Sequence, residues 1–274
     1  MRLLKEVVDF LAPYRVAVRN RSLLWQFVKR NIAVRYRGSM LGLVWSFVQP
    51  LMMLCVYTFV FSVVFQARWD VKLTDKGAFA IIMFCGMALF NIFSESVSLC
   101  CGVITGNPNF VKKVIFPLEI LPLTQTIASF ILGTVWILLL FLGVIFIYGK
   151  LSFTMLLLPL VLIPLFLFTL GICFFVASLG VFVRDTSYAV QVILQVLFFM
   201  TPIFYRIEAI PPQYRWPLQI NPLTTLIEQA RRVFIFGTLP DWKFLGIGFL
   251  VSLIVLQLGF VWFCRTKKGF ADVL

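Results

Sequence analysis

Side chains that could carry out catalysis or bind a metal are scarce in this chain. It contains no His, which excludes a His-based catalytic triad, a His-ligated metal and a His proton relay. The six cysteines lie in apolar runs without a C-x-x-C pair, so they lack the spacing of a zinc site. The carboxylates that could meet at one membrane surface, Glu6, Asp9, Glu119 and Asp185, are far apart in sequence. The sequence therefore predicts no catalytic residue and no metal site.

The composition places the chain in a lipid bilayer. Apolar residues make up 61% of the 274 residues and charged residues 13%, whereas soluble domains have about 45–50% and about 25%. A soluble fold with this ratio would expose large apolar patches to water, which soluble monomers rarely do. The sequence therefore predicts an integral membrane protein.

Six stretches are apolar and long enough for transmembrane helices, each of which needs about 20 residues. They lie at about 40–65, 77–104, 120–149, 153–183, 186–205 and 244–264. An even number of spans puts both termini on one side, where most of the 24 Lys and Arg residues also fall. Because cytoplasmic segments are enriched in positive charge, we expect residues 1–39 and 265–274 in the cytoplasm. The predicted fold is all-α, and topology accounts for the net charge of +13 without nucleic acid.

Glu95 is the only charged residue well inside a predicted span. A carboxylate at the centre of a bilayer costs on the order of 2.5–3.5 kcal/mol on insertion scales. We therefore expect Glu95 to be paired, protonated or in contact with water. A structural role, a substrate contact and a simple break in the second span all remain open.

Two segments at the cytoplasmic edge have distinct patterns. Residues 22–37 predict an amphipathic helix in the membrane interface, with Lys29 and Arg30 on its polar face. This helix could anchor on lipid or dock a partner. In the loop 106–123, Asn107-Pro108 starts and Pro117 stops a short helix that presents Lys112 and Lys113. By spacing alone this loop could also be a plain basic connector.

Residues 203–243, between the fifth and sixth spans, are too polar for another span and too apolar for an ordinary loop. A helix is predicted here, because Asn221 can act as its cap, Pro222 suits the first helical position and Glu228 precedes Arg231. We expect short re-entrant or interfacial helices here, because irregular backbone at membrane depth must be buried in protein or line water. The alternative is a surface loop rich in Trp and Tyr.

Five motifs together carry a family resemblance. They are VRYRGSMLGLVWSFVQPL (34–51), NFVKKVIFPLEILPL (109–123), FVRDTSYAVQ (182–191), TPIFY (201–205) and NPLTTLIEQAR (221–231). In this order and at this chain length, they resemble the membrane subunit of ABC-2 type polysaccharide exporters, which move lipid-linked O-antigen, capsule or teichoic acid.

The resemblance implies a homodimer joined to two copies of a separate ATP-binding subunit in the bacterial inner membrane. The chain lacks a G-x-x-x-x-G-K-[ST] loop, so Mg-ATP is expected on the partner and no cofactor on this chain. The expected cargo is a lipid-linked, undecaprenyl-diphosphate-type polysaccharide such as O-antigen, exported from cytoplasm to periplasm.

The resemblance also assigns roles to residues. The residues implied to contact the partner ATPase are Lys29, Arg30, Asn109, Phe110, Lys112, Lys113 and Phe116. Those implied to form an outer gate are Tyr205, Asn221, Pro222, Glu228 and Arg231. Arg35, Tyr36 and Arg37 stand where the first span meets the cytoplasmic surface, and we expect them to capture the diphosphate headgroup, because Arg binds phosphate oxygens bidentately.

Other functions stay open at this point. An exporter of teichoic acid, a drug or another lipid shares the six-span plan. A membrane-embedded glycosyl or phosphoryl transferase is a different class, but it would need clustered carboxylates, commonly with a metal. A non-catalytic scaffold fits the broken outer segment and Glu95 less well.

Overall fold

The computed structural model describes residues 12–35, 37–64, 76–112, 116–149 and 152–274. Within these ranges the regular structure is helical throughout, without a strand. The prediction of an all-α protein is therefore confirmed for this part of the chain.

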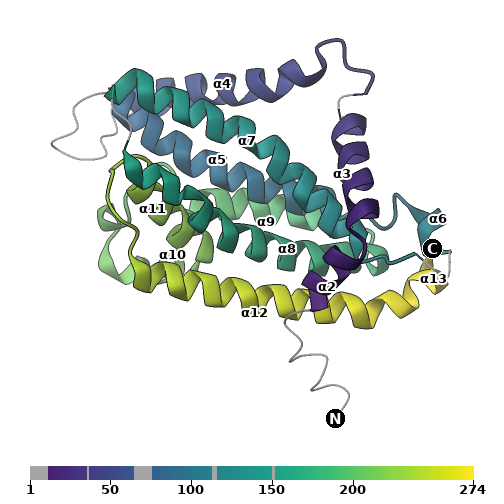
Figure 1. Cartoon of the computed structure of the whole chain (residues 1–274). Coiled ribbons are helices and arrows are strands. Elements are labelled where there is room, and N and C mark those ends of the chain that lie inside the picture. The colour runs from purple at the N-terminus through teal and green to yellow at the C-terminus, as the bar shows by residue number, and fades with distance from the viewer. Residues whose placement is uncertain (1–11, 36, 65–75, 113–115, 150–151) are drawn as a thin grey trace.

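Four helices in the described part are long and apolar enough to cross a membrane: Gly77–Cys100, Ile120–Tyr148, Phe153–Phe182 and Trp242–Val273. They comprise α5 (Lys76–Cys100), α7 (Ile120–Tyr148), α8 (Leu158–Phe182) with the preceding turn η3 (Phe153–Leu157), and α12 (Trp242–Thr266) with its continuation. Figure 1 shows them running side by side as one bundle. They coincide with the second, third, fourth and sixth predicted spans.

The other two predicted spans are shorter helices. α4 covers Trp45–Thr58, between a 3-10 turn (η1, Gly42–Val44) and a π-helical segment (η2, Phe59–Val64). α9 covers Thr186–Met200, and its 15 residues rise about 22 Å, less than the ~30 Å of bilayer hydrocarbon. The fifth span was predicted to reach Tyr205, but Thr201 is extended because Pro202 follows it. The predicted count of six spans is therefore not established by helix length.

α8 and α12 pack with their backbones in contact. A methyl group on Gly259 would lie 2.0 Å from the carbonyl oxygen of Gly171, so both positions require glycine. Small residues commonly allow such close crossings between membrane helices. α5 lies deepest in the bundle, and nearly all of its residues from Ala78 to Phe90 are buried.

The short helices lie at opposite ends of the bundle (Figure 1). At one end are α2 (Ala12–Arg19), α3 (Arg21–Arg35), α6 (Pro108–Val111) and α13 (Phe270–Val273). At the other are the turns η4 (Ile207–Ala209) and η5 (Pro212–Tyr214), followed by α10 (Trp216–Ile220) and α11 (Pro222–Phe234). We call these the α3 end and the α11 end.

The C-terminal residues also pack on the bundle. α12 continues through η6 (Lys267–Gly269) into α13, where Phe270 is fully buried. The Phe270 ring contacts Phe263 and Phe182 at centroid distances of 5.5 and 5.8 Å. The segment 265–274, which we predicted as a cytoplasmic tail, is thus a helical extension fixed to α8.

Candidate functional site

A cavity of about 560 Å³, lined by apolar and polar side chains, opens between α4, α5 and α9. Its polar side chains belong to Gln49 on α4, to Asn91, Ser94, Glu95 and Ser98 on α5, and to Gln191 and Gln195 on α9. Aromatic side chains of Tyr57, Phe90, Trp136, Tyr188 and Phe198 complete the walls. We call this the polar cavity.

Helical periodicity brings the polar side chains of the cavity together. Residues 91, 94, 95 and 98 recur at the i, i+3, i+4, i+7 spacing of one helix face, and residues 191 and 195 are one turn apart. Apart from Glu95, these residues were missed by the sequence analysis. The signal was present as polar residues at helical spacing inside otherwise apolar stretches.

Arg35, the last residue of α3, forms an ion pair with Glu95 of α5. Both side chains are partly exposed, Arg35 at 31% and Glu95 at 25%. Glu95 lies five residues before the end of α5, about 7.5 Å along the helix axis from Cys100. The helix is continuous through Glu95, so the alternative that it marks a break in the second span is wrong.

The pair joins two predictions that were made separately. Arg35 was expected to hold a phosphate, and Glu95 was expected to need a partner. Arg37, two residues further on, is exposed, and Tyr36 lies outside the described residues. Phosphate capture by these residues stays a prediction.

A cluster of three aromatic rings joins α3 to α6. Phe27 contacts Phe110 and Phe116 at centroid distances of 5.3 and 5.6 Å, and Phe110 stacks on Phe116 at 4.6 Å. The Arg30 guanidinium covers the Phe27 ring at 4.4 Å and donates to Asn107 Oδ1 at 3.4 Å. We call this the aromatic cluster. Because its members come from α3, α6 and the loop after α6, these segments are in direct contact.

The predicted coupling residues therefore divide into two groups. Arg30, Phe110 and Phe116 make contacts within the chain, whereas Asn109 and Lys112 are exposed. Lys29 is also exposed and lies over the Trp25 ring at 5.8 Å. Lys113 lies outside the described residues. Contact with an ATPase stays a prediction for all of them.

A second ion pair at the α3 end was missed from the sequence. Lys267 of η6 pairs with Glu119, which is buried and directly precedes α7. It links the C-terminal extension to the loop that follows α6. Lys267 and Glu119 are 148 positions apart, so no local sequence pattern indicates this contact.

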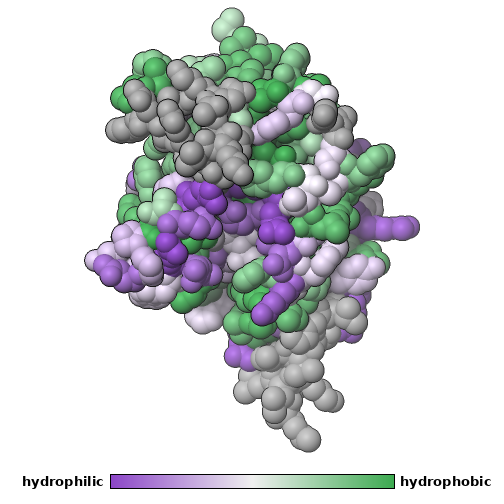
Figure 2. Space-filling view, turned by 90° about the vertical axis from the view of Figure 1, so that its left-hand side faces the viewer, coloured by the Kyte–Doolittle hydropathy of each residue, from purple (hydrophilic) through white to green (hydrophobic). Residues whose placement is uncertain are grey.

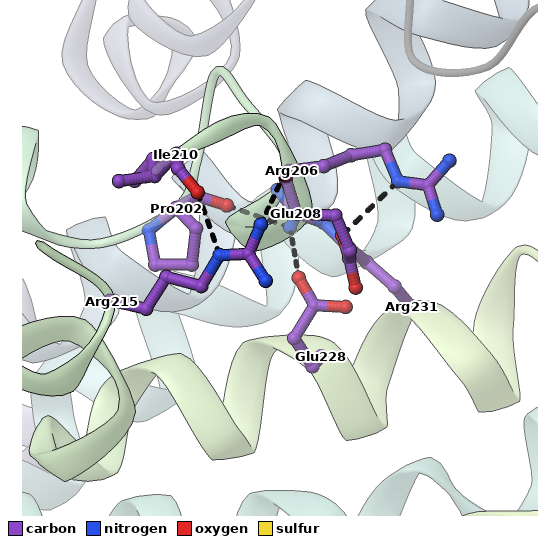
Figure 3. A network of polar contacts seen from close by, with 7 residues as sticks. All are labelled: Pro202, Arg206, Glu208, Ile210, Arg215, Glu228 and Arg231. Atoms are coloured by element: carbon purple, nitrogen blue, oxygen red, sulfur yellow. Dashed lines mark hydrogen bonds and ion pairs between the residues drawn. The ribbon is translucent and has the colours of Figure 1, made fainter. Parts of the chain in front are cut away.

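At the α11 end, Arg231 is fully buried and binds four acceptors, of which Figure 3 shows Pro202 and Glu228. Its guanidinium donates to the carbonyl oxygens of Ile82, Pro202 and Ile203 at 3.2, 2.7 and 2.9 Å. It also donates to Glu228 Oε1 at 2.7 Å. Because these groups come from α5, the turn after α9 and α11 itself, Arg231 ties three segments together. We call this arrangement the arginine clasp.

Gly86 leaves the room that the clasp needs. A methyl group at this position would lie 2.8 Å from Arg231 Nη2 and 3.4 Å from both Ile203 and Ile227. The absence of a side chain at Gly86 on α5 therefore leaves space for the Arg231 side chain on α11.

The remaining predicted gate residues also make contacts within this end. The Asn221 Oδ1 accepts from the Leu223 N–H at 3.0 Å and its Nδ2 donates to Thr201 Oγ1 at 3.0 Å, with Pro222 as the first residue of α11. The predicted cap is thus confirmed. Tyr205 donates to the Phe199 carbonyl at 2.6 Å. A role as a gate stays a prediction.

The surface of this end is polar. Arg206 pairs with Glu208 at 3.3 Å, and Arg215 donates to the carbonyls of Ile210 and Glu208 at 2.7 Å each (Figure 3). Figure 2, which looks onto the end that carries α10 and α11, shows hydrophilic side chains gathered in the middle of this face. The buried clasp thus lies at an end of the bundle whose surface carries exposed charged side chains.

Comparison with known proteins shows which family this chain matches. Residues 22–235 match the model of a family described as ABC-2 type transporter. An O-antigen export system permease protein, RfbA, from Myxococcus xanthus is 30% identical over 92% of this chain and 95% of its own length. An RfbA from Klebsiella pneumoniae is 28% identical with the same coverage. The polysialic acid transport protein KpsM from Escherichia coli is 22% identical over 87% of this chain and 91% of its own. These matches agree with the resemblance carried by the five sequence motifs.

Proposed function

The chain belongs to the ABC-2 type transporter family, and from this membership we propose that it is the membrane subunit of an ATP-driven exporter of lipid-linked O-antigen. Membership makes the chain a multi-pass transport subunit rather than an enzyme, and it implies an ATP-binding partner. The substrate and the direction, from cytoplasm to periplasm, are the proposed part. O-antigen is preferred over polysialic acid because the RfbA relatives are 28–30% identical and the KpsM relative 22%.

The polar cavity is the observation that carries the proposal. Gln49, Gln191 and Gln195 are exposed on the side of α4 and α9, between apolar positions. Lipid hydrocarbon could not satisfy these amides, so they must face water or protein. Amide side chains both donate and accept hydrogen bonds, which suits the hydroxyl groups of a sugar polymer. Aromatic walls offer flat surfaces along which such a polymer can slide.

A second copy of the chain would enclose this cavity. The exposed apolar residues of α4 and α9, such as Met52, Val56, Val192 and Val196, flank the glutamines. If two copies pair through these helices, the apolar positions seal the seam and the amides line a shared path. The homodimer is therefore part of the proposal.

The α3 end is proposed to be cytoplasmic and to receive the ATPase. Asn109 and Lys112 present an exposed edge of α6, and the aromatic cluster joins α6 to α3. A displacement of α6 by the partner would move α3 and, through Arg35, the mouth of the polar cavity. Mg-ATP is bound by the partner, and this chain binds no cofactor. The α11 end then faces the periplasm as the proposed gate.

Deletion of the gene, followed by complementation, tests the proposed function. We expect the deletion strain to lose O-antigen from its surface while lipid-linked polymer accumulates inside the cell. The wild-type chain should restore export when its ATPase is present. Normal surface O-antigen in the deletion strain would refute the substrate. Failure of the purified chain to associate with any ATPase encoded beside it would refute the assembly.

A further inference from the structure

We infer that Arg35 and Glu95 form a diphosphate site that the chain's own carboxylate occupies until a lipid diphosphate displaces it. The inference rests on the proposed function, which supplies a lipid diphosphate as the cargo's headgroup. It adds a competitor to the site: Glu95 acts as an internal stand-in for the phosphate.

The position of the pair supports exchange. Arg35 ends α3 at the edge of the bundle, and Glu95 belongs to the lining of the polar cavity. A ligand that enters the cavity from the α3 end therefore meets the pair close to where it enters. Arg35 keeps 31% of its side chain exposed, so a ligand can reach the arginine without unfolding, whereas the Glu95 Oε1 in the pair is buried.

The chemistry of the two anions supports the same conclusion. A guanidinium binds carboxylates and phosphates through the same planar, bidentate geometry. A diphosphate carries more negative charge than one carboxylate, and exposed Arg37 adds a second cation two residues away. Ser98, which lines the cavity one turn from Glu95, adds a hydroxyl donor, whereas the Ser94 hydroxyl already donates to the Asn91 carbonyl. The diphosphate is thus the better ligand for a site that Glu95 fills at rest.

Displacement of Glu95 also has a consequence for release. The freed carboxylate stays in the cavity wall and repels the bound diphosphate, which lowers its affinity. When the headgroup leaves, Glu95 returns to Arg35 and the site closes. A transporter needs such moderate affinity, because a headgroup held too tightly would stop the next cycle.

Binding of farnesyl diphosphate to the purified complex of this chain with its ATPase tests the inference. Glu95→Gln keeps the shape but removes the competing charge, so it should tighten binding by roughly tenfold, equivalent to about 1.4 kcal/mol. Arg35→Gln should weaken binding, and the double variant should bind like Arg35→Gln alone. The matched control is Glu208→Gln, an exposed, paired glutamate at the other end, which should change nothing.

Unchanged or weaker binding in Glu95→Gln would overturn the inference, as would equal tightening in Glu208→Gln. If Glu95→Gln does not fold, Glu95→Asp weakens the pair while keeping the charge and should tighten binding by a smaller factor. Unchanged diphosphate binding in Glu95→Asp would also overturn the inference. Inorganic pyrophosphate and farnesol, tested alone, separate headgroup recognition from tail binding: tighter binding of farnesol in Glu95→Gln would contradict the assignment.

The outcome is independent of the test of the proposed function. Tighter diphosphate binding without restoration of surface O-antigen by the wild-type chain would support the site and refute the O-antigen cargo. Restored O-antigen with unchanged diphosphate binding in Glu95→Gln would support the cargo and refute the site.

Discussion

Two of the Arg–Glu pairs, Arg231–Glu228 and Arg35–Glu95, lie at opposite ends of the bundle, and their surroundings differ. Arg231 is completely buried and binds Glu228 together with three backbone carbonyls. Arg35 binds Glu95 at a polar cavity and keeps 31% of its side chain exposed. The same two residue types thus form a fixed clasp at the α11 end and an exchangeable pair at the α3 end. Burial and the number of acceptors, rather than residue identity, separate the two roles.

Removal of the arginine at the clasp gives the largest expected effect. Arg231→Ala leaves three buried carbonyls and Glu228 without their donor, which should cost about 3–5 kcal/mol of stability. Thermal unfolding of the purified chain in detergent measures the loss. Arg206→Ala, which breaks a surface pair at the same end, is the control and should have little effect. Equal stability of the two variants would remove the distinction between clasp and surface pair.

Crowding the clasp should have the next largest effect. Gly86→Ala places a methyl group 2.8 Å from Arg231 Nη2, and we expect a cost of about 1–3 kcal/mol from the forced shift. Gly246→Ala on α12 meets nothing within 4 Å and serves as the control in the same unfolding assay. A Gly86→Ala chain as stable as Gly246→Ala would show that the guanidinium moves freely.

At the exchangeable pair, the effect should appear in transport rather than in stability. Arg35→Ala combined with Arg37→Ala should reduce surface O-antigen at least tenfold, equivalent to about 1.4 kcal/mol, because the headgroup loses both cations. Unfolding temperature and association with the ATPase should stay close to wild type. Normal surface O-antigen in this variant would remove the headgroup site, and loss of assembly would make the pair structural like the clasp.

The smallest expected effect concerns the exposed edge of α6. Lys112→Glu should weaken association with the ATPase about fivefold, since exposed charge pairs are worth up to about 1 kcal/mol. The loss should shrink at high salt. Arg265→Glu, another exposed cation at the same end, is the control. If both variants bind the ATPase like wild type, the loop is a basic connector that follows the topology rule.

Local patterns in the sequence predicted the elements but only part of the sites. Hydropathy located the four long helices, and Asn221-Pro222 correctly marked the start of α11. The partner of Glu95 was not visible, because Arg35 is 60 positions away and only folding brings α3 to α5. The clasp was also hidden, because three of its four acceptors are backbone carbonyls, which every residue carries. By contrast, Asn91, Ser94 and Ser98 recur at helical spacing, a local pattern that could have indicated the cavity but was not used.

The central claim is that the polymer passes along the polar cavity, and site-specific photocrosslinking tests it most directly. A photoreactive amino acid replaces Gln195 in the cavity wall or, as a control, Leu250, an exposed apolar residue of α12. In cells that make the polymer and the ATPase, we predict O-antigen attached to the chain at position 195 and none at 250. Absence of glycan at position 195, or equal labelling at both positions, would contradict the account.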